Sequence, residues 1–180
     1  MQLADMLLYM RDRTEDYTGQ NTWSDENLEN LLYDAIYDYY ERTRSHIEVL
    51  ELNSEESLPE NIIDVRGVKA GGRVLERATC PTEVTASSYY LTLDYPPRVQ
   101  LLEPRDVVVE AVTYPALENV PDTKRSALAY HMLTRCFEKL DQEQRAQYYL
   151  MRYEEEVSKA DTSALFNHEN NKHRSTKVIF

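Results

Sequence analysis

The sequence predicts an α+β protein that is mainly α: a helical bundle of about four helices with a β-rich insertion and an extended C-terminal tail. Apolar residues recur with a helical period near both ends of the chain, whereas residues 46–120 are strand-like and interrupted by Pro and Gly. From residue 166 onward no helical period is present. We therefore expect a helical bundle formed by 1–45 and 121–165, a β-rich insertion at 46–120, and an extended C-terminal arm at 166–180.

The strongest element is a helix that begins after Trp23 and ends near Arg44. Ser24 is a preferred N-cap, because its hydroxyl accepts a hydrogen bond from a backbone N–H that the first turn leaves unpaired. Acidic residues follow at the positive end of the helix dipole, and arginines lie at the negative end. The predicted buried stripe has the spacing 3, 1, 3, 1, 3, 1 and consists of Leu28, Leu31, Leu32, Ala35, Ile36, Tyr39 and Tyr40.

Three further helices are expected from the same kind of spacing. Residues 2–12 form a short helix at the start of the chain. Another begins at Asp122 or Thr123 and ends near Leu140, and a last long helix follows. Asp141 and Gln144 have the spacing of a capping box for that last helix. Because the link between the last two helices is short, we expect them to form an antiparallel hairpin.

The insertion is expected to contain short strands, each bounded by Pro, Gly or a polar loop. The pair Gly71-Gly72 predicts a tight turn, because glycine adopts positive φ angles at little cost. No local pattern sets the order in which the strands pair. The strands are expected to begin near Ile47, Ile62, Val74, Tyr89, Val99 and Val107.

The composition limits the classes of function. With 180 residues, 42% of them hydrophobic, the chain can build one domain with a core. Its net charge of −12 argues against tight binding to nucleic-acid backbones. That charge suits a merely soluble acidic protein, an assembling protein, or a surface past which DNA slides. We expect no signal peptide and no membrane span, and we expect Cys80 and Cys136 to be free thiols in a reducing compartment.

Motifs of catalysis and cofactor binding are absent from the sequence. It contains no HExxH, P-loop, GxGxxG or GxSxG pattern. His168 and His173 lie five positions apart, which is not a common metal-ligand spacing. Acidic runs such as Glu154-Glu155-Glu156 are typical of solvated helix faces. We therefore expect a protein that is not an enzyme and that uses no cofactor or metal.

A group of tyrosines is the first candidate interaction surface. Tyr33, Tyr37 and Tyr40 lie within about 60° of one another on the helix that begins after Trp23, beside its buried stripe. Either this helix is buried on two sides within its own bundle, or the tyrosines contact another subunit, because Tyr is favoured in interface cores. Tyr148 on the last helix allows the same two interpretations.

The C-terminal arm is the second candidate. It is slightly basic in an otherwise acidic chain and ends in three apolar residues. It is either a disordered terminus or a peptide that becomes ordered on a partner. The residues of interest are Lys172, Arg174, Lys177, Val178, Ile179 and Phe180.

Several strings in their order along the chain resemble a known family. The chain carries WSDENL at 23–28, SLPENIIDVRGVKAGGRVLE at 57–76, YYLTLDYPP at 89–97 and TYPALENVPD at 113–122. This layout resembles the head-to-tail connector adaptor proteins of tailed bacteriophages, of the tail-tubular-A and gatekeeper-ring kind. The resemblance covers roughly residues 2–160.

The resemblance implies a homo-oligomeric ring beneath the portal protein, with the portal's twelvefold symmetry, in the neck of the virion. Such a ring is assembled in the host cytoplasm, extends a channel through which DNA passes without specific binding, and docks the tail or the next neck protein. In relatives the C-terminal segment binds the portal, which implies that role for the six arm residues named above. The alternative is a small acidic helical module that binds a single protein partner.

Overall fold

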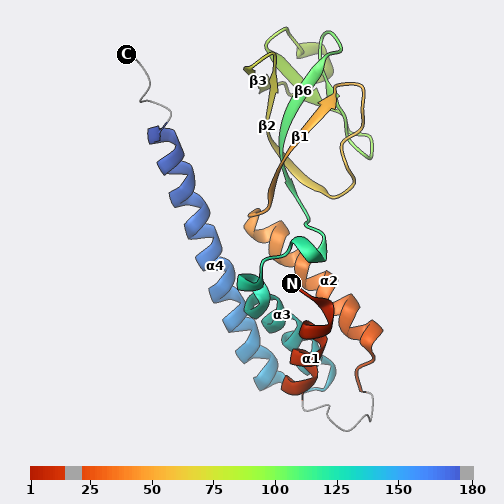
Figure 1. Ribbon diagram of the computed structural model, residues 1–180, viewed down its shortest axis with the longest axis vertical. Helices are drawn as coiled ribbons and strands as arrows, with labels where there is room; N and C mark the ends of the chain where they lie inside the picture. Colours follow the sequence, from red (N-terminus) through yellow and green to blue (C-terminus); the bar gives the residue numbers. More distant parts are fainter. Residues whose placement is uncertain (15–21, 175–180) are drawn as a thin grey trace. The chain divides into compact units, whose positions relative to one another are not determined.

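A computed structural model describes residues 1–14 and 22–174, with side chains described up to Ala160 (Figure 1). The chain forms two compact units. The sheet unit is His46–Tyr114, and the helical unit comprises Met1–Ser45 together with the residues from Pro115 onward. Residues 115–120, which we expected in the insertion, therefore belong with the helices.

Four α-helices make up the described part of the helical unit. They are α1 (Leu3–Arg13), α2 (Asp25–Thr43), α3 (Arg125–Lys139) and α4 (Glu143–Arg174), with the short 3₁₀ helices η2 (Leu117–Asn119) and η3 (Asp122–Lys124) before α3. The predicted cap of α2 is confirmed, because the Ser24 hydroxyl accepts a hydrogen bond from the Asn27 backbone N–H at 3.1 Å. The predicted buried stripe of α2 is also confirmed, except that Leu31 is only partly buried.

The turn between α3 and α4 corrects one prediction. Asp141 has a left-handed backbone with φ of 55°, and its N–H donates to the Glu138 carbonyl at 3.1 Å. The next N–H, of Gln142, donates to the Phe137 carbonyl at 2.9 Å. These two hydrogen bonds form a Schellman motif, which closes the C-terminus of α3. The predicted capping box at Asp141 is therefore wrong, because this residue ends α3 and α4 begins only at Glu143.

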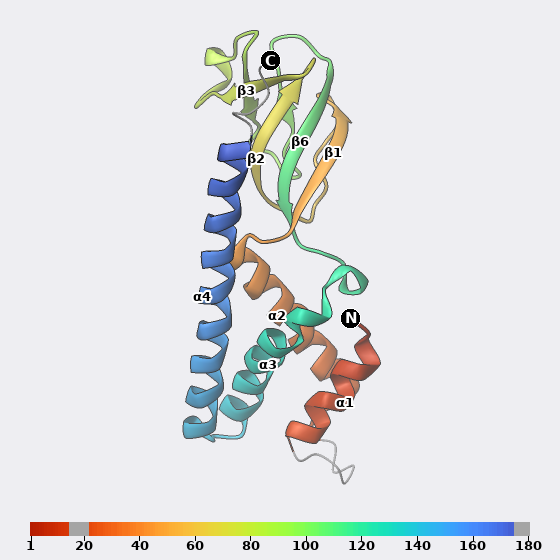
Figure 2. The ribbon, with the colours of Figure 1, turned by 60° about the vertical axis from the view of Figure 1, so that its left-hand side comes forward.

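The core of the helical unit is built around α3, which contacts the three other helices. The hairpin of α3 and α4 places the two helices side by side (Figure 2). α4 contributes Ala146, Tyr153, Val157 and Ala160 to the core. The buried apolar residues of α3 are Ala127, Leu128, Ala129, Met132, Leu133, Cys136 and Phe137.

The length of α4 corrects a second prediction. α4 has 32 residues and α3 has 15, so that α4 is about 48 Å long at 1.5 Å per residue and continues past the end of α3 (Figure 2). Residues 166–174, which we expected to be extended, are helical. The apolar residues of this segment do not recur with a helical period. Such a period indicates which face of a helix is buried, and its absence does not exclude a helix. Between Pro121 and the end of the chain there is no Pro or Gly, the two residues that most strongly disfavour a helix, so nothing in the sequence stops α4 at residue 165.

Six strands form one curled mixed sheet in the sheet unit. Their order is β1-β6-β2-β3-β4-β5, and every neighbouring pair is antiparallel except β3 with β4. Each strand begins within one residue of the position predicted from the sequence. The strands are β1 (Ile47–Asn53), β2 (Ile62–Ala70), β3 (Arg73–Arg77), β4 (Ser88–Leu91), β5 (Val99–Gln100) and β6 (Asp106–Thr113).

Pairing between distant segments defines this sheet. β1 pairs along its whole length with β6, with Ile47 opposite Val112. β2 also pairs with β6, so β6 lies between the two. The predicted tight turn joins β2 to β3, and its glycines Gly71 and Gly72 have φ of 55° and 77°.

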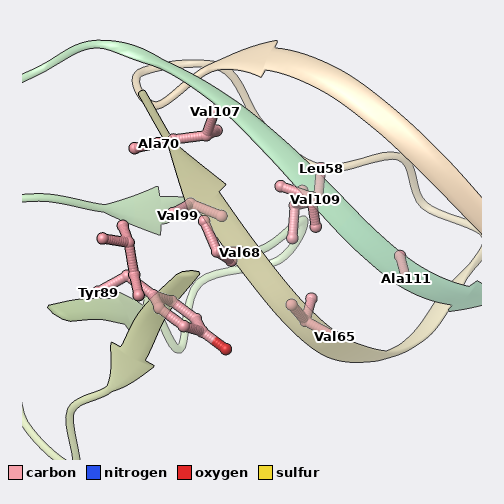
Figure 3. Packing of buried hydrophobic residues seen from close by; sticks show 10 residues of the cluster. Leu58, Val65, Val68, Ala70, Tyr89, Val99, Val107, Val109 and Ala111 are labelled. Carbon is pink, nitrogen blue, oxygen red and sulfur yellow. The ribbon is translucent and has the colours of Figure 1, made fainter. Parts of the chain in front are cut away.

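The core of the sheet unit consists mainly of valine and alanine. Figure 3 shows side chains from β2 and β6 meeting on the same side of the curled sheet as Tyr89 of β4 and Val99 of β5. Leu58, which precedes β2, and Leu75 of β3 add the largest aliphatic side chains of this cluster. The sheet unit thus has a hydrophobic core of its own.

These observations overturn the predicted fold class. The chain is α/β, with four helices and a six-stranded curled mixed sheet in its described part, and is not a mainly helical bundle that carries a small β insertion. The sequence shows the individual strands, but β1 and β6 are more than fifty residues apart in the chain. Because no local pattern reports such pairings, the sequence analysis did not predict that the six strands join into one sheet.

Candidate protein-interaction surfaces

The first candidate surface is a line of exposed side chains along α2. Glu26, Tyr33, Tyr37 and Glu41 lie within about 80° of one another around the helix and are all exposed. Tyr33 is 40% exposed and Tyr37 is 49% exposed. We call these four residues the α2 stripe. Tyr buries its ring readily at protein interfaces while its hydroxyl stays paired, so the stripe suits a protein contact.

Tyr40 does not belong to this exposed surface. It is buried in the helical unit, where its ring lies edge-on to that of Tyr39 with 5.2 Å between the ring centroids. Burial raises the pKa of Tyr40 to about 12. The sequence grouped Tyr40 with Tyr33 and Tyr37, and the structure separates them: Tyr40 packs inside its own unit, and the other two face outward.

The outer side of α4 carries a second set of exposed apolar side chains. Tyr148 and Met151 are 55% and 63% exposed, and they lie three residues apart on the side of the helix that faces away from α3. Leu150 is also exposed, nearer the edge of the α4 core face. The structure therefore places Tyr148 on the surface but on a different helix from the α2 stripe.

An aromatic stack fixes the side chains around Tyr148. Tyr149 lies parallel to Phe137, with 5.5 Å between the ring centroids, and 6.1 Å from Tyr130 on its other side. The Arg145 guanidinium lies 5.3 Å from the Phe137 centroid. The Tyr148 ring meets Tyr149 edge-on at 5.1 Å. These contacts hold the side chains of Arg145 and Tyr148, near the beginning of α4, in fixed positions.

Beside this stack lies a pocket of about 460 Å³ between the C-terminal end of α1 and the beginning of α4. From the part of the chain that the structure describes, two guanidinium groups, one carboxylate and three aromatic rings line it. We call it the arginine–tyrosine pocket. Its lining residues are Asp12, Arg13, Phe137, Gln144, Arg145, Tyr148 and Tyr149.

A polar network holds α2 against α4. The Tyr153 hydroxyl donates to the Asp38 carboxylate at 2.6 Å, and Arg42 Nη1 donates to Glu154 at 2.9 Å. Burial, strengthened by the hydrogen bond to Asp38, raises the pKa of Tyr153 well above its usual value. The hydrogen bonds from Arg42 lower the pKa of Glu154. The network fixes the rotation of α2 and hence the direction in which the α2 stripe points.

Two buried groups of the helical unit have shifted pKa values but are structural. Burial raises the pKa of the Cys136 thiol to about 12, which leaves it an unreactive thiol. Burial lowers the pKa of His131, whose ring lies edge-on to Tyr153 with 5.2 Å between the centroids. Both belong to the core of the unit.

The sheet unit has a pocket of its own, of about 660 Å³, beside β1, β2 and β6. Its charged lining is mainly acidic, with Glu51, Glu56 and Asp106 against Lys69. Among the side chains that the structure describes, no three His, Cys, Asp or Glu residues are grouped as a metal site requires. Within the same residues, no helix has both the length and the apolar character of a membrane span.

The predicted portal-binding residues lie at and beyond the end of α4. Lys172 and Arg174 are in its last turn. Lys177 and the apolar end, Val178, Ile179 and Phe180, lie outside the described residues.

Comparison with protein families and with curated proteins finds no match for this chain. The sequence analysis missed the arginine–tyrosine pocket entirely. Arg13 and Arg145 belong to helices at opposite ends of the chain, and no motif links them. The signal that was present in the sequence, Tyr148 next to Tyr149 shortly after Arg145, indicates a contact but not its partners.

Proposed function

We propose that this protein is a structural virion component, a head-to-tail adaptor that forms a ring beneath the portal of a tailed bacteriophage. The observation that carries the proposal is a pair of exposed aromatic surfaces of different chemistry on one helical unit: the α2 stripe and the arginine–tyrosine pocket. A closed ring needs such a pair, because each subunit meets its two neighbours through two different surfaces.

The composition of both surfaces supports an assembly role. Tyr, Met and Arg are enriched in the cores of protein interfaces. The side chains of Tyr33 and Tyr37 are exposed on α2. Those of Tyr148 and Met151 are exposed on α4, and Tyr148 lines the same pocket as Arg145. A monomer rarely exposes large apolar side chains in two separate clusters without a partner for them.

The end of α4 supports binding to the portal. α4 continues past α3, so its last turns reach beyond the packed part of the hairpin. Lys172 and Arg174 lie there, in a chain of net charge −12. An arm that binds only when the portal is present makes ring assembly depend on that partner.

The overall charge supports a channel that DNA traverses. A ring built from subunits of net charge −12 repels the DNA backbone and keeps it mobile in the lumen. This accords with a role that involves DNA without specific binding to it.

The test is assembly on the portal protein encoded in the same genome. The chain, the portal and their mixture are compared by light scattering and negative-stain electron microscopy. We expect a ring stacked on the portal, with one adaptor per portal subunit. A chain lacking residues 168–180 is the matched control: its helical unit should fold, as judged by circular dichroism, and should no longer bind the portal. A full-length chain that ignores the portal at every ratio contradicts the proposal.

A second candidate function is a small acidic helical module that binds one protein partner. The exposed pair Tyr148 and Met151 on one side of α4 favours it, because one helix with apolar anchors can dock into a groove. Stoichiometry distinguishes the two functions: the module forms a one-to-one complex, and the adaptor forms a closed ring.

A further inference from the structure

We propose that the α2 stripe of one copy of this chain docks in the arginine–tyrosine pocket of the next copy. Tyr37 enters the pocket, and the Glu41 carboxylate pairs with the Arg145 guanidinium. The inference rests on the proposed function, since it names the two surfaces through which neighbouring ring subunits meet. A second copy is the occupant because the two surfaces carry opposite charges: carboxylates on the stripe and guanidinium groups in the pocket.

The pocket provides positive charge between aromatic walls. Among the residues that the structure describes, its lining carries the guanidinium groups of Arg13 and Arg145 and the carboxylate of Asp12, in a chain whose net charge is −12. Arg13 lies 5.3 Å from the Tyr9 centroid, and Arg145 lies at the same distance from that of Phe137. Cations held along aromatic faces are ordered before a partner binds, so less conformational entropy is lost on binding.

The α2 stripe presents the matching groups. Tyr37 and Glu41 are one helical turn apart on the same side of α2, and both are exposed. A tyrosine ring fits within a pocket of about 460 Å³ and can stack on the Tyr148 and Tyr149 rings that line it. The Glu41 carboxylate, one turn further along α2, then pairs with the Arg145 guanidinium.

The geometry of the helical unit requires that this contact join two copies. Asp38 and Arg42 face α4, as their bonds to Tyr153 and Glu154 show. Tyr33 and Tyr37 lie roughly 140° around α2 from those two residues, and so point away from α4. The pocket is built on the first turns of α4. A stripe that points away from α4 cannot fill the pocket of its own chain, so the contact is head-to-tail and can close a ring.

A charge swap tests the pairing. Arg145→Glu and Glu41→Arg each place like charges opposite one another, and each should weaken ring assembly on the portal at least about tenfold. Combining both substitutions in one chain restores opposite charges and should recover assembly. Arg73→Glu, an exposed position of the sheet unit, changes the net charge by the same amount as Arg145→Glu and should leave assembly unchanged. The recovery by the double variant also shows that the single variants are folded.

Cross-linking tests the contact directly. In a Cys80→Ser background, an Asp34→Cys chain, substituted beside the stripe, is mixed with a Gln144→Cys chain, substituted in the pocket lining, and treated with a short bis-maleimide, so that Tyr37 and Tyr148 stay in place. We expect dimers that contain one chain of each kind, because the stripe of one copy meets the pocket of the other. Tyr33→Phe with Tyr37→Ser gives a second test that leaves the pocket intact, and should weaken assembly at least as much as Glu41→Arg.

The outcomes separate this inference from the proposed function. If wild-type rings form on the portal and the single charge variants assemble normally, the inference is overturned and the adaptor function stands. If no ring forms on the portal, the adaptor function fails, and the pairing is judged by sedimentation velocity of the chain alone. Self-association that the single variants abolish and the swap restores then supports the pairing, and its absence overturns it.

Discussion

The two units of this protein build their cores in different ways. In the helical unit the core is made of large side chains such as Tyr39, Phe137 and Met132, and a polar network crosses it. In the sheet unit the core is mainly valine and alanine, with Val68 and Val109 at its centre, and the backbone pairing of six strands holds it together. The helical unit therefore depends on side-chain packing, and the sheet unit depends more on strand register.

This difference accounts for where the interaction surfaces lie. Helices held by one buried stripe leave their opposite faces available for partners, which is where Tyr37 and Tyr148 are found. A curled sheet must use one face for its own core. Each unit also carries one cysteine, Cys80 in the sheet unit and Cys136 in the helical core, so thiol reactivity reports on the two units separately.

The largest effect should come from the helical core. Leu32→Ala removes a fully buried side chain from α2 and should lower the free energy of unfolding by about 3 kcal/mol, the cost of the lost burial and the remaining cavity. Leu8→Ala, on an exposed part of α1, should change it by less than about 0.5 kcal/mol. Labelling with a thiol reagent should become faster at Cys136 in the first variant and stay unchanged at Cys80. Equal acceleration at both thiols would show that the units do not unfold separately.

A smaller effect is expected in the sheet core. Val109→Ala on β6 should lower the stability of the sheet unit by about 2 kcal/mol, because fewer methyl groups are removed than in Leu32→Ala. The exposed Val49 of β1 is the control, and its replacement by Ala should be nearly neutral. Hydrogen exchange of the β2 and β6 amides measures the loss. If exchange of the β2 and β6 amides stayed unchanged while exchange in α3 became faster, Val109 would not stabilise the sheet unit as we expect.

The sequence predicted single elements better than their arrangement. The cap at Ser24, the stripe of α2 and the starts of the strands follow from local patterns of a few residues. The six-stranded sheet depends on the pairing of Ile47 with Val112, and α4 continues through residues 166–174, where the sequence has no apolar period. Neither property leaves a periodic trace, so the fold class and the extended conformation of residues 166–174 were predicted wrongly.

The candidate surfaces divide in the same way. Exposure of Tyr33 and Tyr37 could be suggested from helix periodicity, because both lie beside the apolar stripe. Tyr40 was predicted both in the apolar stripe and in the tyrosine group, and the structure shows that it belongs to the buried stripe. The arginine–tyrosine pocket brings together Arg13 of α1 and Arg145 of α4, which lie far apart in the sequence. Such a site becomes visible only when the helices are assembled.

The third prediction concerns pH and applies to the helical unit alone. Burial lowers the pKa of His131 in the folded state below its ordinary value of about 6.5. As the pH falls below about 6.5, the unfolded chain binds a proton there before the folded unit does, and the helical unit loses stability. Above that pH His131 is neutral in both the folded and the unfolded chain, and the helical unit keeps its full stability. Denaturant unfolding between pH 7.5 and pH 5 should show a weaker slope for His131→Gln than for the wild type, and an identical slope would contradict the assignment.

The smallest effect should come from the exposed ion pair of Arg42 and Glu154, which joins α2 to α4. The side chains are 37% and 48% exposed, so solvent and salt screen their attraction and Glu154→Gln should cost no more than about 1 kcal/mol. Because Arg42 lowers the pKa of Glu154, this contribution is present above the ordinary carboxylate pKa and is lost as the pH falls through the folded value. Thermal unfolding of both chains at low and high salt measures it, and the difference should vanish at high salt. A loss as large as that of Leu32→Ala would mean that polar contacts, and not buried side chains, hold the helical unit together.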